Sequence, residues 1–256
     1  MTLIEHILLL TVSFISNTLS AMAGGGAGLL QFPILIFLGL GFSTALSTHK
    51  IATVALGFGA TLKHGKNKNI DFKFAAFILA CGLPGVVIGV KVVVHIPEAV
   101  GEIILGILTI SIGLYSLNSK ELGITNKHKN MQLWEHLLGG AGLFLLGIFN
   151  GSLTSGTGLF VTFWLVRWFK LPFKQATAYT MILVGLFWNG SGAFTLALNV
   201  TPQWNWLPAL LIGSAIGGYI GAHLAQRFGN KVIKKVFEVI TVCVGLLLCI
   251  TAYNSW

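Results

Sequence analysis

The chain of 256 residues is 55% hydrophobic and only 9% charged. Because a soluble domain usually carries about 25% charged residues, this composition excludes an ordinary soluble domain and indicates a protein embedded in a membrane. The net charge of +9 suggests an anionic partner, but the basic residues lie in short segments between apolar stretches, which argues against nucleic acid and fits the positive-inside rule.

Ten apolar stretches follow one another along the chain. They cover residues 4–22, 29–40, 45–62, 74–90, 99–117, 137–149, 159–168, 176–198, 207–225 and 232–253. A membrane-spanning helix needs roughly 20 apolar residues, and several of these stretches approach that length. We therefore predict an all-α polytopic membrane protein with about eight to ten membrane helices.

A glycine-rich break interrupts the first apolar region between residues 22 and 29, and a similar break interrupts the middle of the chain over residues 154–159. Each break separates a longer apolar arm from a shorter one, which predicts a helical hairpin over residues 4–40 and another over residues 137–168. A 12-residue arm covers only about 18 Å of the roughly 30 Å hydrocarbon core. The second arms should therefore be short, with their tips inside the membrane; whether the hairpins cross fully or are re-entrant stays open.

The two halves of the chain align with an offset of about 130 residues. The matching pairs are Gly28 with Gly158, Gly85 with Gly217, Gly89 with Gly221, and Gly113 with Gly245. We predict two repeats, residues 1–118 and 136–256, joined by a cytoplasmic linker over residues 119–135. Each repeat would hold one broken hairpin and three transmembrane helices, and a helix broken at corresponding positions of two halves points to a transporter binding site.

The charge distribution predicts the topology. Lysines and arginines gather in four segments, near residues 63–73, 120–129, 167–174 and 227–235, which should face the cytoplasm. The segments 39–43, 199–205 and 252–256 carry none and should face outward. Each hairpin then begins and ends on one side, and the three spans of one half run opposite to those of the other. The repeats are therefore predicted to be inverted, with both termini outside.

The hairpin tips are the predicted binding site. The first turn of a helix has free N–H groups and a positive dipole end, so two N-termini that meet near the midplane would bind an anion. Glycines at the tips would let a ligand approach the backbone, and polar side chains of the second tip would add donors. The candidates are Gly24, Gly25, Gly26, Gly28, Gly158, Asn150, Ser152, Thr154, Ser155 and Thr157. The alternative is that the glycines only permit tight hairpins and the hydroxyls only cap helices.

Lys50 lies inside the apolar stretch 45–62, where an ionisable residue is by default a candidate for function. It could hold the charge of an anion, or it could instead extend to the membrane interface. The adjacent His49 could titrate near neutral pH and couple transport to protons, although a lone histidine is more often a satisfied polar residue. Weaker cavity candidates are Gln31, Thr180 and Asn189, followed by Asn17 and Thr18.

The sequence contains none of the common catalytic motifs, neither a zinc-protease motif nor a P-loop nor a nucleophile elbow. We expect no enzyme, no cofactor and no metal. Cys81, Cys243 and Cys249 form no Cys-x-x-Cys motif and are interpreted as buried small apolar residues. Acidic residues are too few to line a cation pathway, which favours an anion as the substrate.

On these residues the chain resembles the TauE/SafE family of sulfite exporters, also called TSUP. The segment Gly24-Gly25-Gly26-Ala27-Gly28-Leu29 followed by Phe32-Pro33 carries the first part of the resemblance. The segment Ala45-Leu46-Ser47-Thr48-His49-Lys50 looks like the family's Ala-x-Gly-Thr-Asn-Lys, and an inverted copy surrounds Gly156-Thr157-Gly158. The resemblance covers nearly the whole chain. His49 stands where the family usually has asparagine, and Phe163 stands near the position of an expected proline. Both departures bear on which substrate the protein binds.

The resemblance implies a multi-pass carrier of the bacterial inner membrane that moves sulfite, sulfoacetate or a similar organic anion, usually as an exporter. Carried over, Lys50 and the two tips would contact the anion. We expect alternating access, with a small-anion channel and a non-transporting membrane assembly scaffold as the alternatives. The expected partners are the small anionic substrate, membrane lipid, protons as a coupling ion and a second copy of the chain, but not nucleic acid.

Overall fold

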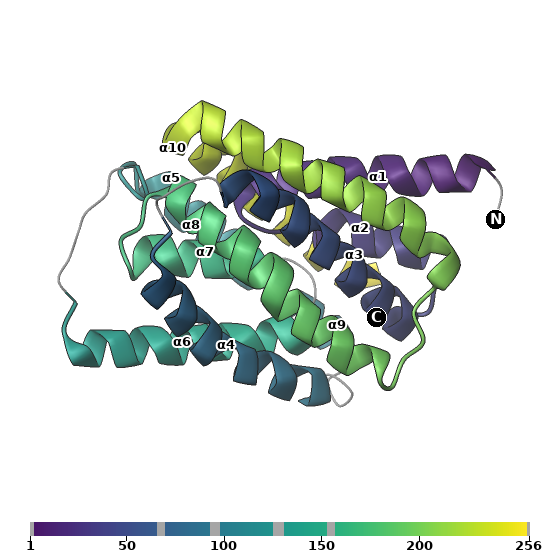
Figure 1. The fold of residues 1–256 in the computed structure, drawn as a ribbon, viewed down its shortest axis with the longest axis horizontal. Coiled ribbons are helices and arrows are strands. Elements are labelled where there is room, and N and C mark those ends of the chain that lie inside the picture. Colours follow the sequence, from purple (N-terminus) through teal and green to yellow (C-terminus); the bar gives the residue numbers. More distant parts are fainter. Residues whose placement is uncertain (1–2, 66–69, 93–97, 125–130, 153–156, 255–256) are drawn as a thin grey trace.

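The computed structural model describes residues 3–65, 70–92, 98–124, 131–152 and 157–254, and the regular secondary structure of these residues is all helical (Figure 1). The first six helices are α1 (Leu3–Ala23), α2 (Gly28–Phe37), α3 (Phe42–His64), α4 (Phe72–Val92), α5 (Glu98–Asn118) and α6 (Leu133–Ser152). They are followed by α7 (Thr157–Arg167), α8 (Phe173–Tyr179), η2 (Thr180–Trp188), α9 (Asn189–Ala197), η3 (Trp204–Trp206) and α10 (Leu207–Asn254).

Five helical segments within the described residues are long and apolar enough to cross a membrane. They are Leu3–Ala23, Phe72–Lys91, Leu133–Ser152, Phe173–Ala197 and Trp204–Leu247. The last of them is interrupted at Gly229, whose φ of 78° is not helical, so α10 consists of two helices that meet at this residue. The prediction of an all-helical polytopic membrane protein is confirmed.

Large apolar side chains cover the outside of the bundle. Ile4 of α1, Phe37 of α2, Phe72 of α4 and Leu133 of α6 are all exposed. An apolar surface of this extent would drive association in water, whereas in a bilayer it contacts lipid tails. The interior in turn holds large aromatic side chains, and Trp188 on η2 is fully buried.

The apolar stretch 176–198, expected as one regular helix, has a π-helical middle. The nine residues of η2 lie between the short helices α8 and α9. In a π-helix each N–H bonds to the fifth preceding carbonyl, which widens the turn, and such segments often lie at functional sites. Gly185 of η2 contacts Gly57 of α3 backbone to backbone, with 3.0 Å between the position of an added Cβ on Gly185 and the Cα of Gly57.

The first glycine break ends α1 with three successive residues of positive φ. The φ angles of Gly24, Gly25 and Gly26 are 86°, 144° and 101°, values that residues other than glycine rarely adopt. The N–H groups of Gly24 and Gly25 both donate to the carbonyl of Ser20, at 2.9 Å each. The chain then enters α2, whose 10 residues, like the 11 of α7, extend only about 15–17 Å at 1.5 Å per residue.

The helices pack in pairs that correspond between the two halves of the chain. α1 lies along α10, where Gly213 and Gly217 contact Leu10 and Phe14, and α6 lies along α4, where Gly85 contacts Phe144. α3 packs against η2, and α5 packs against α10. Figure 1 shows α1 starting at the N-terminus at one end of the long axis, whereas α6 starts at the opposite end. This arrangement supports the inverted repeat, which stays a prediction.

Candidate functional site

The two hairpin tips meet inside the bundle, backbone against backbone. A Cβ added to Gly158 would lie 2.9 Å from the Cα of Gly25 and 3.2 Å from the carbonyl oxygen of Gly24. A Cβ added to Gly25 would overlap the backbone of Gly158 and Leu159. Glycine is therefore the only residue that permits this approach. The hydroxyl of Thr162 on α7 locks the contact by donating to the carbonyl of Gly24, at 2.7 Å.

A small cavity of about 30 Å³ lies between the tips and is lined by both halves of the chain. Since one water needs roughly 10–15 Å³ of such space, this cavity has room for about two waters. Its polar wall consists of Ser20, His49, Thr53, Asn150, Thr157 and Asn189, its backbone wall includes Gly25, Gly26, Gly28 and Gly158, and its apolar wall includes Leu56, Met181 and Val184. The cavity thus combines the N-terminal ends of α2 and α7 with side chains of α1, α3, α6 and η2.

Three buried polar atoms of the cavity wall have no hydrogen-bond partner within the described part of the chain. They are the Oγ of Ser20, the Nδ1 of His49 and the Oδ1 of Asn150. A buried polar atom without a partner costs about 1–3 kcal/mol, and native proteins rarely keep several of them together. These atoms therefore mark a place where a polar ligand or ordered water completes the hydrogen bonding.

Asn150 connects the helices around the cavity. Its amide nitrogen donates to the Oγ1 of Thr157 at 2.9 Å and to the Oδ1 of Asn189 at 3.2 Å. These two bonds fix the side chain between the end of α6, the first turn of α7 and the start of α9. The Oδ1 of Asn150 is the atom left for a ligand with a donor group or for water.

Lys50 does not line the cavity itself but contacts Asn150, which does. Its side chain is only 1% exposed, and its amine donates to the carbonyl of Asn150 at 2.6 Å. Gly192 of α9 makes room for it, because a Cβ added there would lie 3.2 Å from the amine. Within the described residues no carboxylate forms an ion pair with Lys50. The cation therefore lies at the negative end of the α6 dipole, where it stabilises the tip and adds positive potential next to the cavity.

His49 lines the cavity and Thr180 lies beside Gly158 of the second tip, and the neighbours of the two residues differ. The ring of His49 meets that of Phe32 edge on, with 6.2 Å between the ring centroids. The Oγ1 of Thr180 instead lies 2.9 Å from the Oγ1 of Thr162. The surroundings of His49 are therefore aromatic, and those of Thr180 are hydroxylic.

Several residues that were predicted to form the binding site do not line the cavity. Gln31 and Asn17 belong to a buried polar cluster with Ser13 and Ser214, in which the amide nitrogen of Asn17 lies 3.2 Å from the Oε1 of Gln31 and 3.0 Å from the Oγ of Ser214. Thr18 and Ser152 donate to carbonyls of their own helices. Gly24 takes part in the tip contact but does not line the cavity, and Thr154 and Ser155 lie outside the described residues.

The sequence analysis missed Ser20, Thr53 and Thr162. Ser20 precedes Asn150 by 130 residues, so the internal repeat already indicated it as the counterpart of a predicted residue. Thr53 follows His49 by four residues and thus lies on the same helix face. Thr162 had no such signal, because Phe32 occupies the corresponding position of the first half.

Membrane-length apolar helices around a buried polar cavity, formed where two chain breaks meet, define a multi-pass membrane transporter. The family profile described as sulfite exporter TauE/SafE matches residues 9–248. The chain belongs to this family.

Similar proteins carry names of the same class. The chain is 26% identical over 244 residues to a probable membrane transporter protein, ORF9, of Sinorhizobium, a match that covers 94% of this chain and 90% of the relative. It is 25% identical to a probable membrane transporter protein of Haemophilus influenzae (91% and 90% covered) and 25% identical to YfcA of Escherichia coli, a probable membrane transporter protein (95% and 89% covered). No solved structure matches the chain.

Proposed function

We propose that this protein is a secondary carrier that exports a small sulfur-containing or organic anion, such as sulfite, sulfoacetate or a similar sulfonate. The observation that carries the proposal is the cavity where the two tips meet, with its three unpartnered polar atoms and the amine of Lys50 directly behind it. Helix N-termini and a buried cation favour negative charge, whereas no carboxylate of the described residues lines the cavity.

The size of the cavity supports transport by alternating access. Its volume of about 30 Å³ is smaller than a sulfite or sulfonate group needs, so binding requires the tips to separate. In the proposed cycle the two inverted repeats, residues 1–118 and 136–256, move against each other around the tips. An anion that leaves a negative cell interior gains about 2.3 kcal/mol per charge per 100 mV, which favours export.

The proposed location is the bacterial inner membrane, with both termini outside and the linker 119–135 in the cytoplasm. This topology rests on the four basic segments of the chain. Proton coupling through His49 or Lys50 is part of the proposal, and His49 lines the cavity with an Nδ1 that has no partner among the described residues.

The binding test measures thermal unfolding of the purified protein with sulfite, thiosulfate, sulfate, sulfoacetate, taurine and lactate. A ligand at a hundredfold excess over its Kd stabilises the folded state by about 2.7 kcal/mol. We expect one of the sulfur anions to stabilise the wild type and not Lys50→Ala. Lys91→Ala, which changes an exposed lysine at the end of α4, is the matched control and should respond like the wild type. Stabilisation by a neutral or cationic solute alone would contradict the proposal.

Flux assays distinguish a carrier from the two alternatives. In proteoliposomes loaded with the stabilising anion, a carrier saturates and exchanges labelled for unlabelled anion, whereas a channel conducts without exchange. A scaffold shows neither activity. An imposed pH gradient in the same vesicles tests coupling, and flux that ignores the gradient would remove His49 from the mechanism.

A further inference from the structure

A second hollow lies on the side of the bundle, between α1 and the part of α10 that follows Gly229. It has a volume of about 420 Å³, and its walls include Leu19 of α1 and Val236, Val239, Ile240 and Cys243 of α10. We call it the lateral groove. Leu19, Val239 and Cys243 are exposed, although cysteine was expected to be buried, so in the membrane this groove opens toward lipid.

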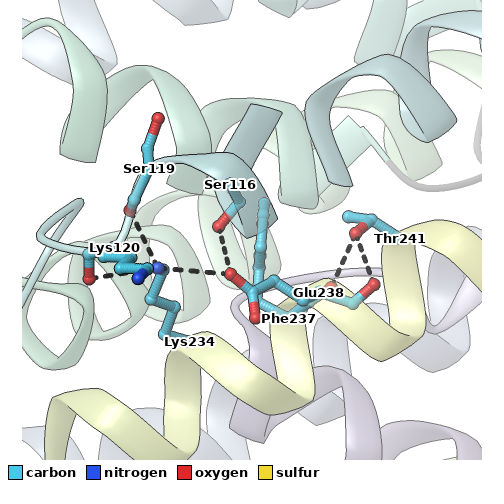
Figure 2. Close-up of polar contacts among 7 residues, drawn as sticks. All are labelled: Ser116, Ser119, Lys120, Lys234, Phe237, Glu238 and Thr241. Atoms are coloured by element: carbon cyan, nitrogen blue, oxygen red, sulfur yellow. Dashed lines mark hydrogen bonds and ion pairs between the residues drawn. The ribbon is translucent and has the colours of Figure 1, made fainter. Parts of the chain in front are cut away.

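Among the residues that the structure describes, one charged side chain, Lys235, lines the lateral groove, and no carboxylate does. Its neighbour Lys234 points the other way. Figure 2 shows the amine of Lys234 donating to the carbonyls of Ser119 and Lys120, at 2.8 and 3.2 Å, and lying 3.4 Å from the carboxylate of Glu238. The charge of Lys234 is therefore neutralised by Glu238 and by carbonyls that follow α5. Lys235, in contrast, is exposed and has no partner among the described residues.

The dimensions of the lateral groove match one leaflet of a bilayer. Lys235 lies near the start of the last helix, in the basic segment predicted to face the cytoplasm. Cys243 follows eight residues later, which is about 12 Å deeper at 1.5 Å per residue. Half of the hydrocarbon core is about 15 Å thick. A molecule with an anionic head at Lys235 and a hydrocarbon chain extending toward Cys243 fits this arrangement.

The lateral groove lies next to the tip cavity, because Ser20 and Gly26 line both. We propose that an anionic phospholipid of the cytoplasmic leaflet occupies the groove, with its phosphate on Lys235 and one acyl chain along Val239 and Cys243. The bound chain covers the side of the tips that faces the bilayer. This covering role rests on the proposed function, whereas the binding itself does not.

The test uses the thiol of Cys243 as a reporter of groove occupancy. The delipidated full-length protein in neutral detergent is titrated with phosphatidylglycerol or phosphatidylcholine, and maleimide labelling is followed peptide by peptide by mass spectrometry. We expect phosphatidylglycerol to slow the labelling of Cys243 at about fivefold lower concentration than phosphatidylcholine, the factor that one interfacial lysine supplies. Labelling of the half-buried Cys249, which lies against Gly106 of α5, should not change.

Variants of Lys235 test whether its charge causes the preference for phosphatidylglycerol. Lys235→Ala should remove the preference for phosphatidylglycerol, and Lys235→Arg should keep it. Lys73→Ala, an exposed lysine of α4 outside the groove, should behave like the wild type. Equal protection by both lipids, or an unchanged preference in Lys235→Ala, would overturn the proposal. Protection that grows with protein concentration and needs no lipid would also overturn it, because a second copy of the chain would then cover the groove. Since no substrate is present, these results do not depend on transport.

Discussion

At the scale of single residues, Asn150 and Lys50 act as one unit. The carbonyl of Asn150 accepts the bond from Lys50, while its side chain faces the cavity and holds Thr157. A change at either residue therefore alters both the position of the second tip and the potential at the cavity. The burial of Lys50 could not be predicted from sequence, because the apolar stretch 45–62 placed Lys50 near its start and an extended side chain could equally have reached the interface.

The substitution Asn150→Asp tests this unit, because it keeps the shape of the side chain and adds a negative charge to the cavity. Two like charges about 4 Å apart repel by about 4 kcal/mol at an effective dielectric constant of 20. We expect at least roughly a hundredfold loss of anion affinity, measured by the anion-dependent shift in Tm. Asn199→Asp, at an exposed position after α9, is the control and should leave the affinity unchanged. Undiminished affinity in Asn150→Asp would place the anion elsewhere.

At the scale of helices, most of the fold could be predicted and most of the irregular features could not. The apolar stretches marked each helix to within a few residues, because membrane helices need long apolar runs. The π-helical segment η2 could not be predicted, since it leaves no distinct pattern in the sequence. For the same reason Thr162, whose partner Gly24 lies 138 residues away, was missed.

The tip contact predicts unequal effects of glycine replacements. Gly25→Ala introduces a side chain at a φ of 144° and overlaps the backbone of Gly158, which should destabilise the protein by about 3 kcal/mol or more and abolish flux. Gly190→Ala is the matched control, because a Cβ there meets nothing within 4 Å and Gly190 lies in α9. It should be neutral or stabilise by up to about 1 kcal/mol. Thermal unfolding and anion flux measure both effects, and equal behaviour of the two variants would show that the tips do not touch.

At the scale of the whole molecule, the proposed inverted repeat connects packing with transport. α1 along α10 and α6 along α4 are corresponding pairs, while α3 with η2 and α5 with α10 join the two halves. Glycines lie at these contacts, so the helix backbones pack closely. The offset of about 130 residues already predicted which helices correspond, but it could not show which would touch.

The topology makes a prediction that intact cells can test. In separate variants, Glu121→Cys and Gln203→Cys introduce thiols on opposite sides of the proposed membrane plane. A membrane-impermeant maleimide should label the Gln203→Cys variant on intact cells and the Glu121→Cys variant only after permeabilisation. Native thiols are accounted for by the wild type measured in parallel. Labelling in the reverse order would contradict the topology proposed from the four basic segments.

The unequal neighbours of the two tips have a consequence for the resting state. In a carrier of inverted repeats, the inward-open and outward-open forms arise when the two halves exchange conformations. Identical halves would give both forms the same free energy. Here one half has the aromatic pair Phe32 and His49, and the other has the hydroxyl pair Thr162 and Thr180. In the proposed alternating-access cycle we therefore expect the carrier without cargo to favour one opening over the other, with these four side chains contributing to the difference.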